Sequence, residues 1–166
     1  MVALRHALAI LILPFTATVV LPALLLGPDR WRLAASWALA STALGVAFVG
    51  LGLALVAGTI ALFARVGKGT LAPWDPPRRL VVRGVYRHVR NPMISGVLAI
   101  LLGEALALRS SALLAWFATF LAANLLYIPG VEEPMMVRRF PGDYEEYRRH
   151  VPRWIPRLTP WQSPSR

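Results

Sequence analysis

Side chains able to bind a charged ligand gather in three short segments that follow residue 66. The first is a glycine turn at 67–70. The second is the run 86–91, which holds a tyrosine, two arginines, a histidine and an asparagine, and the third is the adjacent pair Glu132 and Glu133. Guanidinium and backbone N–H groups bind carboxylates, whereas carboxylates bind ammonium groups and hydroxyls. Together the three segments could hold a ligand that carries both charges and hydroxyl groups.

Long apolar blocks surround these segments and must position them. The chain is 57% hydrophobic and 16% charged, whereas soluble domains carry about 25% charged residues. A helix needs about 20 apolar residues to cross a bilayer. Four blocks reach or approach this length: 7–26, 33–64, 92–108, which is interrupted only by Glu104, and 110–131. The sequence therefore predicts an all-α fold, a polytopic membrane helix bundle of about four transmembrane helices.

The segments between and after the blocks predict how the helices are connected. Prolines and glycines in the connector 65–91 exclude a continuous helix there. Pro92 suits the first position of the third helix, where a missing N–H costs nothing. The short link at 108–111 predicts an antiparallel hairpin, 128–130 should break the fourth helix, and 143–150 predicts a cytoplasmic surface helix. Because of the hairpin, residues 90–92 and 130–133 should lie near each other at the same depth.

We divide the chain into two N-terminal transmembrane helices at 1–64 and a core at 65–166 that comprises connector, helical hairpin and cytoplasmic C-terminal segment. The first apolar block could instead be a secretory signal. A signal's apolar core runs for roughly 7 to 15 residues and ends at a small-residue cleavage site. This block is longer and no clear cleavage pattern follows it, which favours a membrane span.

The net charge of +10 comes from basic residues that flank the spans: seven of the eighteen lie between 65 and 90 and seven more between 138 and 166. Basic flanks mark the cytoplasmic side of a membrane. We therefore expect both termini in the cytoplasm, in the inner membrane of a bacterial or archaeal cell. Anionic lipids at that surface are the expected partners of this charge, and nucleic acid is not. The absence of cysteine excludes disulfides and thiolate metal sites, and we expect no metal site.

Glu104 is an ionisable residue inside the third predicted span. Such residues usually face the interior of a bundle, because exposure to lipid is costly. We expect it to pair with Arg109 or Asn124. The alternative is that it lines a cavity for a lipophilic acceptor.

The chain resembles a family of membrane enzymes over about residues 67 to 161. The ordered pieces are Gly-Val-Tyr at 84–86, Arg-Asn-Pro-Met-Ile-Ser-Gly at 90–96, Glu-Glu-Pro at 132–134, Tyr-Glu-Glu-Tyr at 144–147 and Val-Pro-Arg-Trp-Ile-Pro at 151–156. Their order is similar to that of the isoprenylcysteine carboxyl methyltransferases and the related phospholipid N-methyltransferases. The core pattern of that family is Arg-His-Pro-x-Tyr-x-Gly, followed some forty residues later by paired glutamates. Arg90, Pro92 and Gly96 match it.

The resemblance implies an S-adenosyl-L-methionine-dependent methyltransferase whose acceptor is a lipophilic small molecule or lipid within the bilayer. It implies that the donor lies in a cytoplasmic pocket formed by the last two helices and the connector. The implied cofactor-binding residues are Gly69, Arg79, Leu80, Val81, Tyr86, Arg90, Asn91, Pro92, Glu132 and Glu133, of which Arg90, Asn91 and Glu132 would be catalytic. Leu80, Val81 and Tyr86 could pack against adenine.

Two positions depart from the family pattern, since Asn91 replaces its histidine and Ile94 its tyrosine. Asn91 cannot titrate, and His88 should point away from the site, so no general base is apparent. The departures leave open whether the acceptor is a carboxylate oxygen or an amine. They also leave open a non-catalytic lipid-binding protein. A second enzymatic alternative is a reductase of the sterol-reductase kind that uses NADPH, whose C-terminal membrane helices look similar.

Several of these residues also have a purely structural interpretation. The glutamate pair could be a solvated helix start, since acids there favour the helix dipole. Arg87 is expected to do no more than orient the chain. Tyr144 and Tyr147 are expected to be packing residues of the surface helix.

Overall fold

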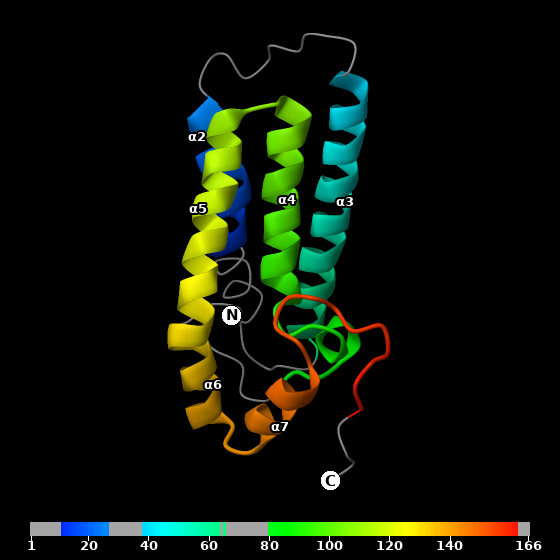
Figure 1. Ribbon diagram of the computed structural model, residues 1–166, viewed down its shortest axis with the longest axis vertical. Helices are drawn as coiled ribbons and strands as arrows, with labels where there is room; N and C mark the ends of the chain where they lie inside the picture. The colour runs from blue at the N-terminus through cyan, green and yellow to red at the C-terminus, as the bar shows by residue number, and fades with distance from the viewer. Residues whose placement is uncertain (1–10, 27–37, 64, 66–79, 163–166) are drawn as a thin grey trace.

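The computed structural model describes residues 11–26, 38–63, 65 and 80–162 (Figure 1). This part of the chain is helical and contains no strand. Its elements, in order, are η1 Leu11–Val20, α2 Leu21–Leu26, α3 Ala38–Leu62, η4 Gly84–Arg87, α4 Pro92–Leu108, α5 Ser111–Tyr127, η5 Ile128–Glu132, α6 Glu133–Arg139 and α7 Asp143–His150.

The long helices α3, α4 and α5 run side by side, with η1 and α2 beside α5, while α6 and α7 gather at one end (Figure 1). Two helices are long and apolar enough to cross a membrane, Leu39–Leu62 and Ser111–Arg139. Two further apolar helices, Pro14–Leu26 and Pro92–Leu108, are shorter. The predicted helical membrane bundle is therefore confirmed. Of the four expected spans, two reach the full length within the described residues.

Glycines allow α3 and α4 to pack closely. A Cβ atom added to Gly52 would lie 2.5 Å from the carbonyl oxygen of Gly96, and one added to Gly45 would lie 2.5 Å from that of Gly103. At such distances only a hydrogen fits between the two backbones. Small residues at helix crossings are the usual device for this in membranes, where packing rather than the hydrophobic effect holds helices together.

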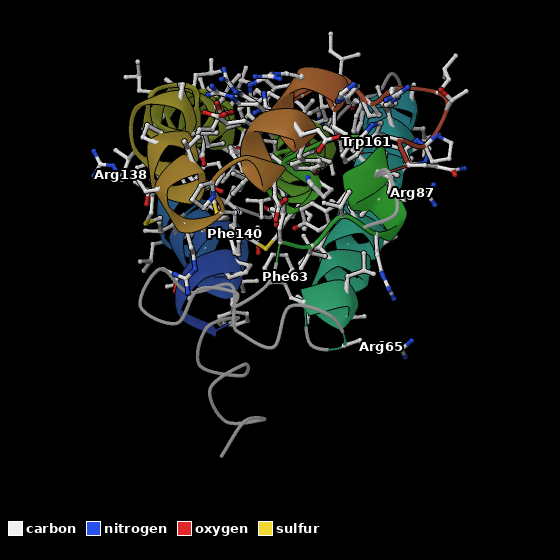
Figure 2. The ribbon with its side chains drawn as sticks, turned by 90° about the horizontal axis from the view of Figure 1, so that it is seen from below. Phe63, Arg65, Arg87, Arg138, Phe140 and Trp161 are labelled. Carbon is white, nitrogen blue, oxygen red and sulfur yellow. The ribbon has the colours of Figure 1, made fainter. Side chains whose placement is uncertain are left out.

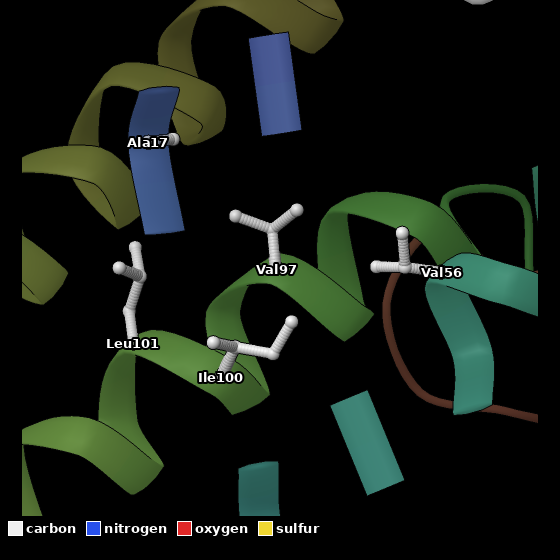
Figure 3. Close-up of a cluster of buried hydrophobic side chains, with 5 residues drawn as sticks. All are labelled: Ala17, Val56, Val97, Ile100 and Leu101. Carbon is white, nitrogen blue, oxygen red and sulfur yellow. The ribbon is translucent and has the colours of Figure 1, made fainter. Parts of the chain in front are cut away.

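A small apolar core joins these helices to the N-terminal segment (Figure 3). Its buried members are Ala17, Val56, Val97, Ile100 and Leu101. The indole Nε1 of Trp116, on α5, donates to the carbonyl oxygen of Ala17 at 3.0 Å. Because Trp116 also packs against this cluster, one residue of α5 anchors η1 through both apolar and polar contact.

The predicted hairpin between α4 and α5 is confirmed. Helix α4 begins at Pro92, as expected, and ends at Leu108; the next residue, Arg109, adopts the left-handed conformation with φ 49°. Ser110 then caps α5, its side chain accepting a hydrogen bond from the Leu113 amide at 3.3 Å. A left-handed residue followed by a serine cap reverses the chain within two residues.

The expected break at 128–130 is wrong. The helix continues from α5 through η5 into α6, because η5 widens into a π turn in which the Glu133 N–H donates to the carbonyl oxygen of Ile128. A wider turn accommodates Pro129, which cannot donate a hydrogen bond of its own. Glu132 and Glu133 are consequently held on a continuation of the α5 axis.

The C-terminal segment 151–162 folds back against the entrance to α4. Three backbone hydrogen bonds hold it there: Arg90 N to Pro152 O at 2.9 Å, Arg157 N to His88 O at 3.0 Å, and Trp161 N to Arg87 O at 2.9 Å. Beneath it α7, the predicted surface helix, buries Tyr144 and Tyr147 in an apolar cluster with Val151 and Trp161. The packing role expected of the two tyrosines is confirmed.

Candidate functional site

Arg90, Glu133 and Arg153 form an ion cluster where α4 begins and α6 starts. Arg90 Nη1 donates to Glu133 Oε1 at 2.8 Å. Arg153 donates through Nε to Oε1 at 2.6 Å and through Nη2 to Oε2 at 2.8 Å. The Glu133 side chain is 8% exposed, so it is not part of a solvated helix start. The hairpin thus brings Arg90 and Glu133 together as expected, and both Glu133 oxygens are occupied by guanidinium groups.

Asn91 holds the C-terminal segment in place. It is the residue that precedes α4, a position where asparagine usually accepts a hydrogen bond from the helix. Its side chain makes no such cap. Instead Nδ2 donates to the carbonyl oxygen of Arg153 at 3.3 Å, and its own carbonyl oxygen accepts from the Ser95 hydroxyl at 3.0 Å. Asn91 therefore couples the start of α4 to the segment that carries Arg153.

Tyr86 lies in the interior of the same end of the bundle. It is 9% exposed, and its ring meets that of Phe63 edge-on at a centroid distance of 5.6 Å. The hydroxyl of Tyr147 donates to the carbonyl oxygen of Tyr86 at 2.7 Å. Burial raises the pKa of Tyr86 well above its usual range, and the charges of Tyr147 and Glu132 raise it further. The phenol is therefore neutral and lies within the electrostatic reach of Glu132.

Glu132 differs from its neighbour, because its carboxylate forms no hydrogen bond or ion pair with any residue that the structure describes. The residue is only partly exposed. An ionised carboxylate that is largely withdrawn from water is costly unless something neutralises or hydrogen-bonds it. Glu132 is thus a carboxylate with binding capacity left over.

Arg90 also has capacity left over. Its Nε is buried and has no hydrogen-bond partner among the described residues. Buried donors without a partner are uncommon in folded proteins, and each requires an explanation. The described residues supply no partner for the Glu132 carboxylate or the Tyr86 hydroxyl either. The junction therefore offers a ligand both a positively charged hydrogen-bond donor and a negatively charged acceptor.

The remaining predicted site residues have varied positions. Val81 is 4% exposed and Pro92 is buried at the first turn of α4. Leu80 packs against the cluster of Tyr144, Tyr147 and Val151. Gly69 and Arg79 lie outside the described residues.

Two basic residues of the run 86–91 face the C-terminal segment instead of the junction. The ring Nδ1 of His88 donates to the carbonyl oxygen of Arg157 at 2.8 Å. Arg87 Nε donates to the carbonyl oxygen of Trp161 at 2.6 Å, and Figure 2 shows these two residues close together at the edge of the molecule. His88 therefore points away from the site, as expected, whereas Arg87 does more than orient the chain.

Glu104 is half-buried, and its Oε2 has no hydrogen-bond partner among the described residues. The expected pairing with Asn124 is absent from the described contacts, because the Asn124 amide donates to the carbonyl oxygen of Phe120 at 2.8 Å, within its own helix.

Arg153 and Tyr147 are the contributors that sequence reasoning missed. Arg153 stands in the Val-Pro-Arg-Trp-Ile-Pro piece at 151–156 and Tyr147 in the Tyr-Glu-Glu-Tyr piece at 144–147. Both pieces entered the resemblance, but no spacing rule connects either residue with Glu133 or Tyr86, because the contacts arise when the tail folds back.

Residues 40–143 match the family model described as phospholipid methyltransferase. The match takes in α4, α5 and both glutamates, and it covers more than half of the chain. The chain belongs to the phospholipid methyltransferase family. Membership of this family implies a membrane methyltransferase and favours that function over a reductase. The matched region crosses the boundary proposed at residue 64 and ends before Arg153, so the division into two parts stays a prediction. Neither the curated proteins nor the solved structures contain a match.

Proposed function

We propose that this protein is an S-adenosylmethionine-dependent methyltransferase of the membrane, which methylates a carboxylate oxygen or an amine of a lipophilic or amphipathic acceptor. The observation that carries the proposal is the junction of α4 and η5, inside the family match. There a carboxylate on Glu132, a buried guanidinium nitrogen on Arg90 and the hydroxyl of Tyr86 have no partner among the described residues.

The donor's groups fit what this junction leaves free. Its ammonium group and ribose hydroxyls suit the carboxylate of Glu132, while its carboxylate suits the guanidinium of Arg90, whose Nε has no partner among the described residues. Glu133 is not proposed as a direct ligand, since Arg90 and Arg153 occupy both of its oxygens. In this proposal Glu133 holds the Arg90 guanidinium in position. Val81 and Tyr86 supply buried apolar surface at the same end of the bundle.

The donor would supply an activated methyl group for in-line displacement by the acceptor's nucleophile. What the protein contributes to such a step is alignment and exclusion of water. Contacts at the junction support such a role: Asn91 holds the C-terminal segment against the entrance to α4 through the Arg153 carbonyl oxygen, and Tyr147 holds the backbone of Tyr86.

An amine acceptor would also have to lose a proton, whereas a carboxylate acceptor would not. Asn91 cannot accept one, and the Nδ1 of His88 is engaged by the tail. Glu132 has a carboxylate at the junction without a partner among the described residues, and it is the group we propose for that role. The site lies where α4 begins and α5 ends, so a lipophilic acceptor could approach from the bilayer with its polar end foremost.

Donor binding by the purified protein in detergent tests the proposal. Wild-type protein should bind S-adenosylmethionine and S-adenosylhomocysteine but not NADPH, and should transfer labelled methyl groups to a lipid extract. Glu132→Gln should weaken donor binding by about tenfold, as expected for the loss of one charge-assisted hydrogen bond. Glu145→Gln, on α7, removes the same charge away from the junction and should bind like wild type.

The proposal fails if wild-type protein binds neither compound, or if Glu132→Gln and Glu145→Gln bind the donor alike. Binding of NADPH instead would revive the reductase interpretation. The distribution of label between methyl esters and methylamines in the extract would decide between oxygen and nitrogen acceptors.

A further inference from the structure

A second polar site lies on the side of η4 that faces away from the junction. A shallow groove of roughly 460 Å³ is lined by Val82, Arg83, Gly84, Arg87 and Gln162. Its polar surface comes from two guanidinium groups, one amide and backbone, and it has no carboxylate in its lining. Tyr86 belongs to the same short helix, but it is buried against Phe63 and Tyr147. The groove is therefore separate from the proposed donor site.

The positive charge of the groove is not neutralised by the described residues. Arg87 uses Nε to hold the Trp161 carbonyl, which fixes the guanidinium in place and leaves its two terminal nitrogens without a described partner. Arg83 is exposed and forms no ion pair with a described residue. Arg90 and Arg153, at the junction, share Glu133 instead. Two neighbouring guanidinium groups, one of them held in place and neither paired with a described acid, suit a phosphate group, which each can bind through a pair of N–H donors.

The position of the groove indicates where the phosphate comes from. A Cβ atom on Gly84 would lie 3.0 Å from the Cδ1 atom of Leu62, the last residue of the candidate span Leu39–Leu62. The groove thus begins at the level where α3 ends. Arg65 lies just beyond the end of α3, on the same side of the molecule as Arg87 (Figure 2). Arginines at the end of a span meet lipid headgroups, and anionic headgroups lie in the cytoplasmic leaflet, the side on which we expect this end of the bundle.

We propose that this groove binds the phosphate diester of an anionic lipid headgroup. Arg83 and Arg87 contact the phosphate, the amide of Gln162 bonds a headgroup hydroxyl, and Val82 borders the glycerol. Because the same Arg87 holds the Trp161 carbonyl, a bound lipid also ties the C-terminal segment to the membrane surface.

The full-length protein, purified in a neutral detergent, is titrated with phosphatidylglycerol, with phosphatidylcholine and with inorganic phosphate, and bound lipid is counted by native mass spectrometry. Wild type should retain phosphatidylglycerol in preference to phosphatidylcholine. Arg83→Gln should weaken phosphatidylglycerol binding by about fivefold, and the double variant Arg83→Gln/Arg87→Gln by about twenty-five-fold. Arg148→Gln/Arg149→Gln removes the same charge from exposed positions on α7 and should leave this affinity unchanged.

Arg87→Gln also removes a contact to the tail and could destabilise the double variant. In that case the single variant Arg83→Gln, which breaks no described contact, is the deciding test. Equal loss of binding in the groove and α7 variants would mean diffuse attraction and would overturn the proposal. Displacement of the lipid by an equal concentration of inorganic phosphate would overturn the lipid as ligand and assign the groove to a soluble phosphate.

Discussion

The two adjacent glutamates show how much a residue's role depends on its partners. Glu133 is shared by two arginines, whereas Glu132, one residue earlier, has no described partner. In the sequence they are a pair of equal acids. In the structure Glu133 organises the junction, whereas the Glu132 carboxylate has no partner within the described part of the chain.

Replacing each glutamate should therefore have a different main effect. Glu133→Gln leaves Arg90 and Arg153 facing a neutral amide at a largely buried site, and should lower the stability by about 3 kcal/mol. Glu132→Gln removes a carboxylate that has no described partner and with it the cost of withdrawing that charge from water. The unfolding temperature should therefore stay unchanged or rise. Thermal unfolding of both variants in the same detergent measures the difference. An equal loss of stability in the two variants would contradict these assignments.

Arg153 should act as a positioning residue for Arg90 through Glu133. Arg153→Lys keeps the charge but cannot form both hydrogen bonds to Glu133. We expect the KM for the donor to rise several-fold with kcat less affected. Because the two residues share an interaction, the effects of Glu133→Gln and Arg153→Gln on donor affinity should be strongly non-additive in a double-mutant cycle. Additive effects would show that Arg153 acts independently of Glu133.

Stability should fall in alkaline solution because of the buried tyrosines. Burial raises the pKa of Tyr147 above its ordinary value of 10.0, and the charge of Tyr144 raises it further. A group whose pKa is raised in the folded state contributes stability below its unfolded pKa and loses it as the pH rises further. The unfolding temperature should therefore decline from about pH 10 upward. Tyr147→Phe should flatten this decline, whereas Tyr127→Phe, at an exposed position, should not.

At the scale of elements, close packing of α3 on α4 sets the depth at which α4 begins. The glycines of the two helices face each other in two pairs, Gly45 with Gly103 and Gly52 with Gly96. Any change that separates the helices displaces Arg90 and Asn91 with the start of α4. The packing of the spans and the geometry of the site are therefore linked.

A comparison of two glycines on one helix tests this link. Gly52→Val places side-chain atoms against the backbone and side chain of α4, and overpacking of this kind costs about 1–3 kcal/mol. Gly50 has nothing within 4 Å of an added Cβ atom, so Gly50→Val should be tolerated. Thermal unfolding and donor binding should both be impaired in the first variant only. A similar tolerance at both positions would show that the helices can separate without cost.

At the scale of the whole molecule, the C-terminal segment joins parts of the chain that lie far apart in sequence. Its hydrogen bonds reach Arg87, His88, Arg90 and Asn91. The junction is consequently held together in part by residues beyond the end of the family match at residue 143.

Topology is a prediction at this scale. Basic residues around the connector and the C-terminal segment should hold both on the cytoplasmic side. A reporter that is active only in the cytoplasm, fused after residue 166, should be active, and one that requires export should not. Cysteine introduced at Ser110, in the α4–α5 turn, should be labelled by an impermeant reagent from outside. The chain has no natural cysteine to interfere. Labelling from the cytoplasmic side alone would show that the orientation is the reverse of the one predicted.

The sequence by itself determined the class of fold and the neighbourhood of the site. Apolar blocks of bilayer length dictate helices, because backbone polar groups cannot be left unpaired in lipid. The two-residue link after Leu108 dictates a hairpin, and the hairpin places Arg90 near Glu133. Pro92 marks the start of α4, because the N–H that proline lacks is not needed at the first position of a helix.

Only the tertiary structure decided which groups at the junction remain available. The π turn at Pro129 keeps the helix continuous, and so sets the direction of Glu132 and Glu133. The folded-back tail then brings Arg153 to Glu133 and engages His88 and Arg87. These contacts join residues that are far apart in the chain, and no local propensity or spacing encodes them. Two of the three polar segments, 86–91 and 132–133, thus meet at one junction, at which Glu132 and Arg90 keep hydrogen-bonding capacity that no described residue uses.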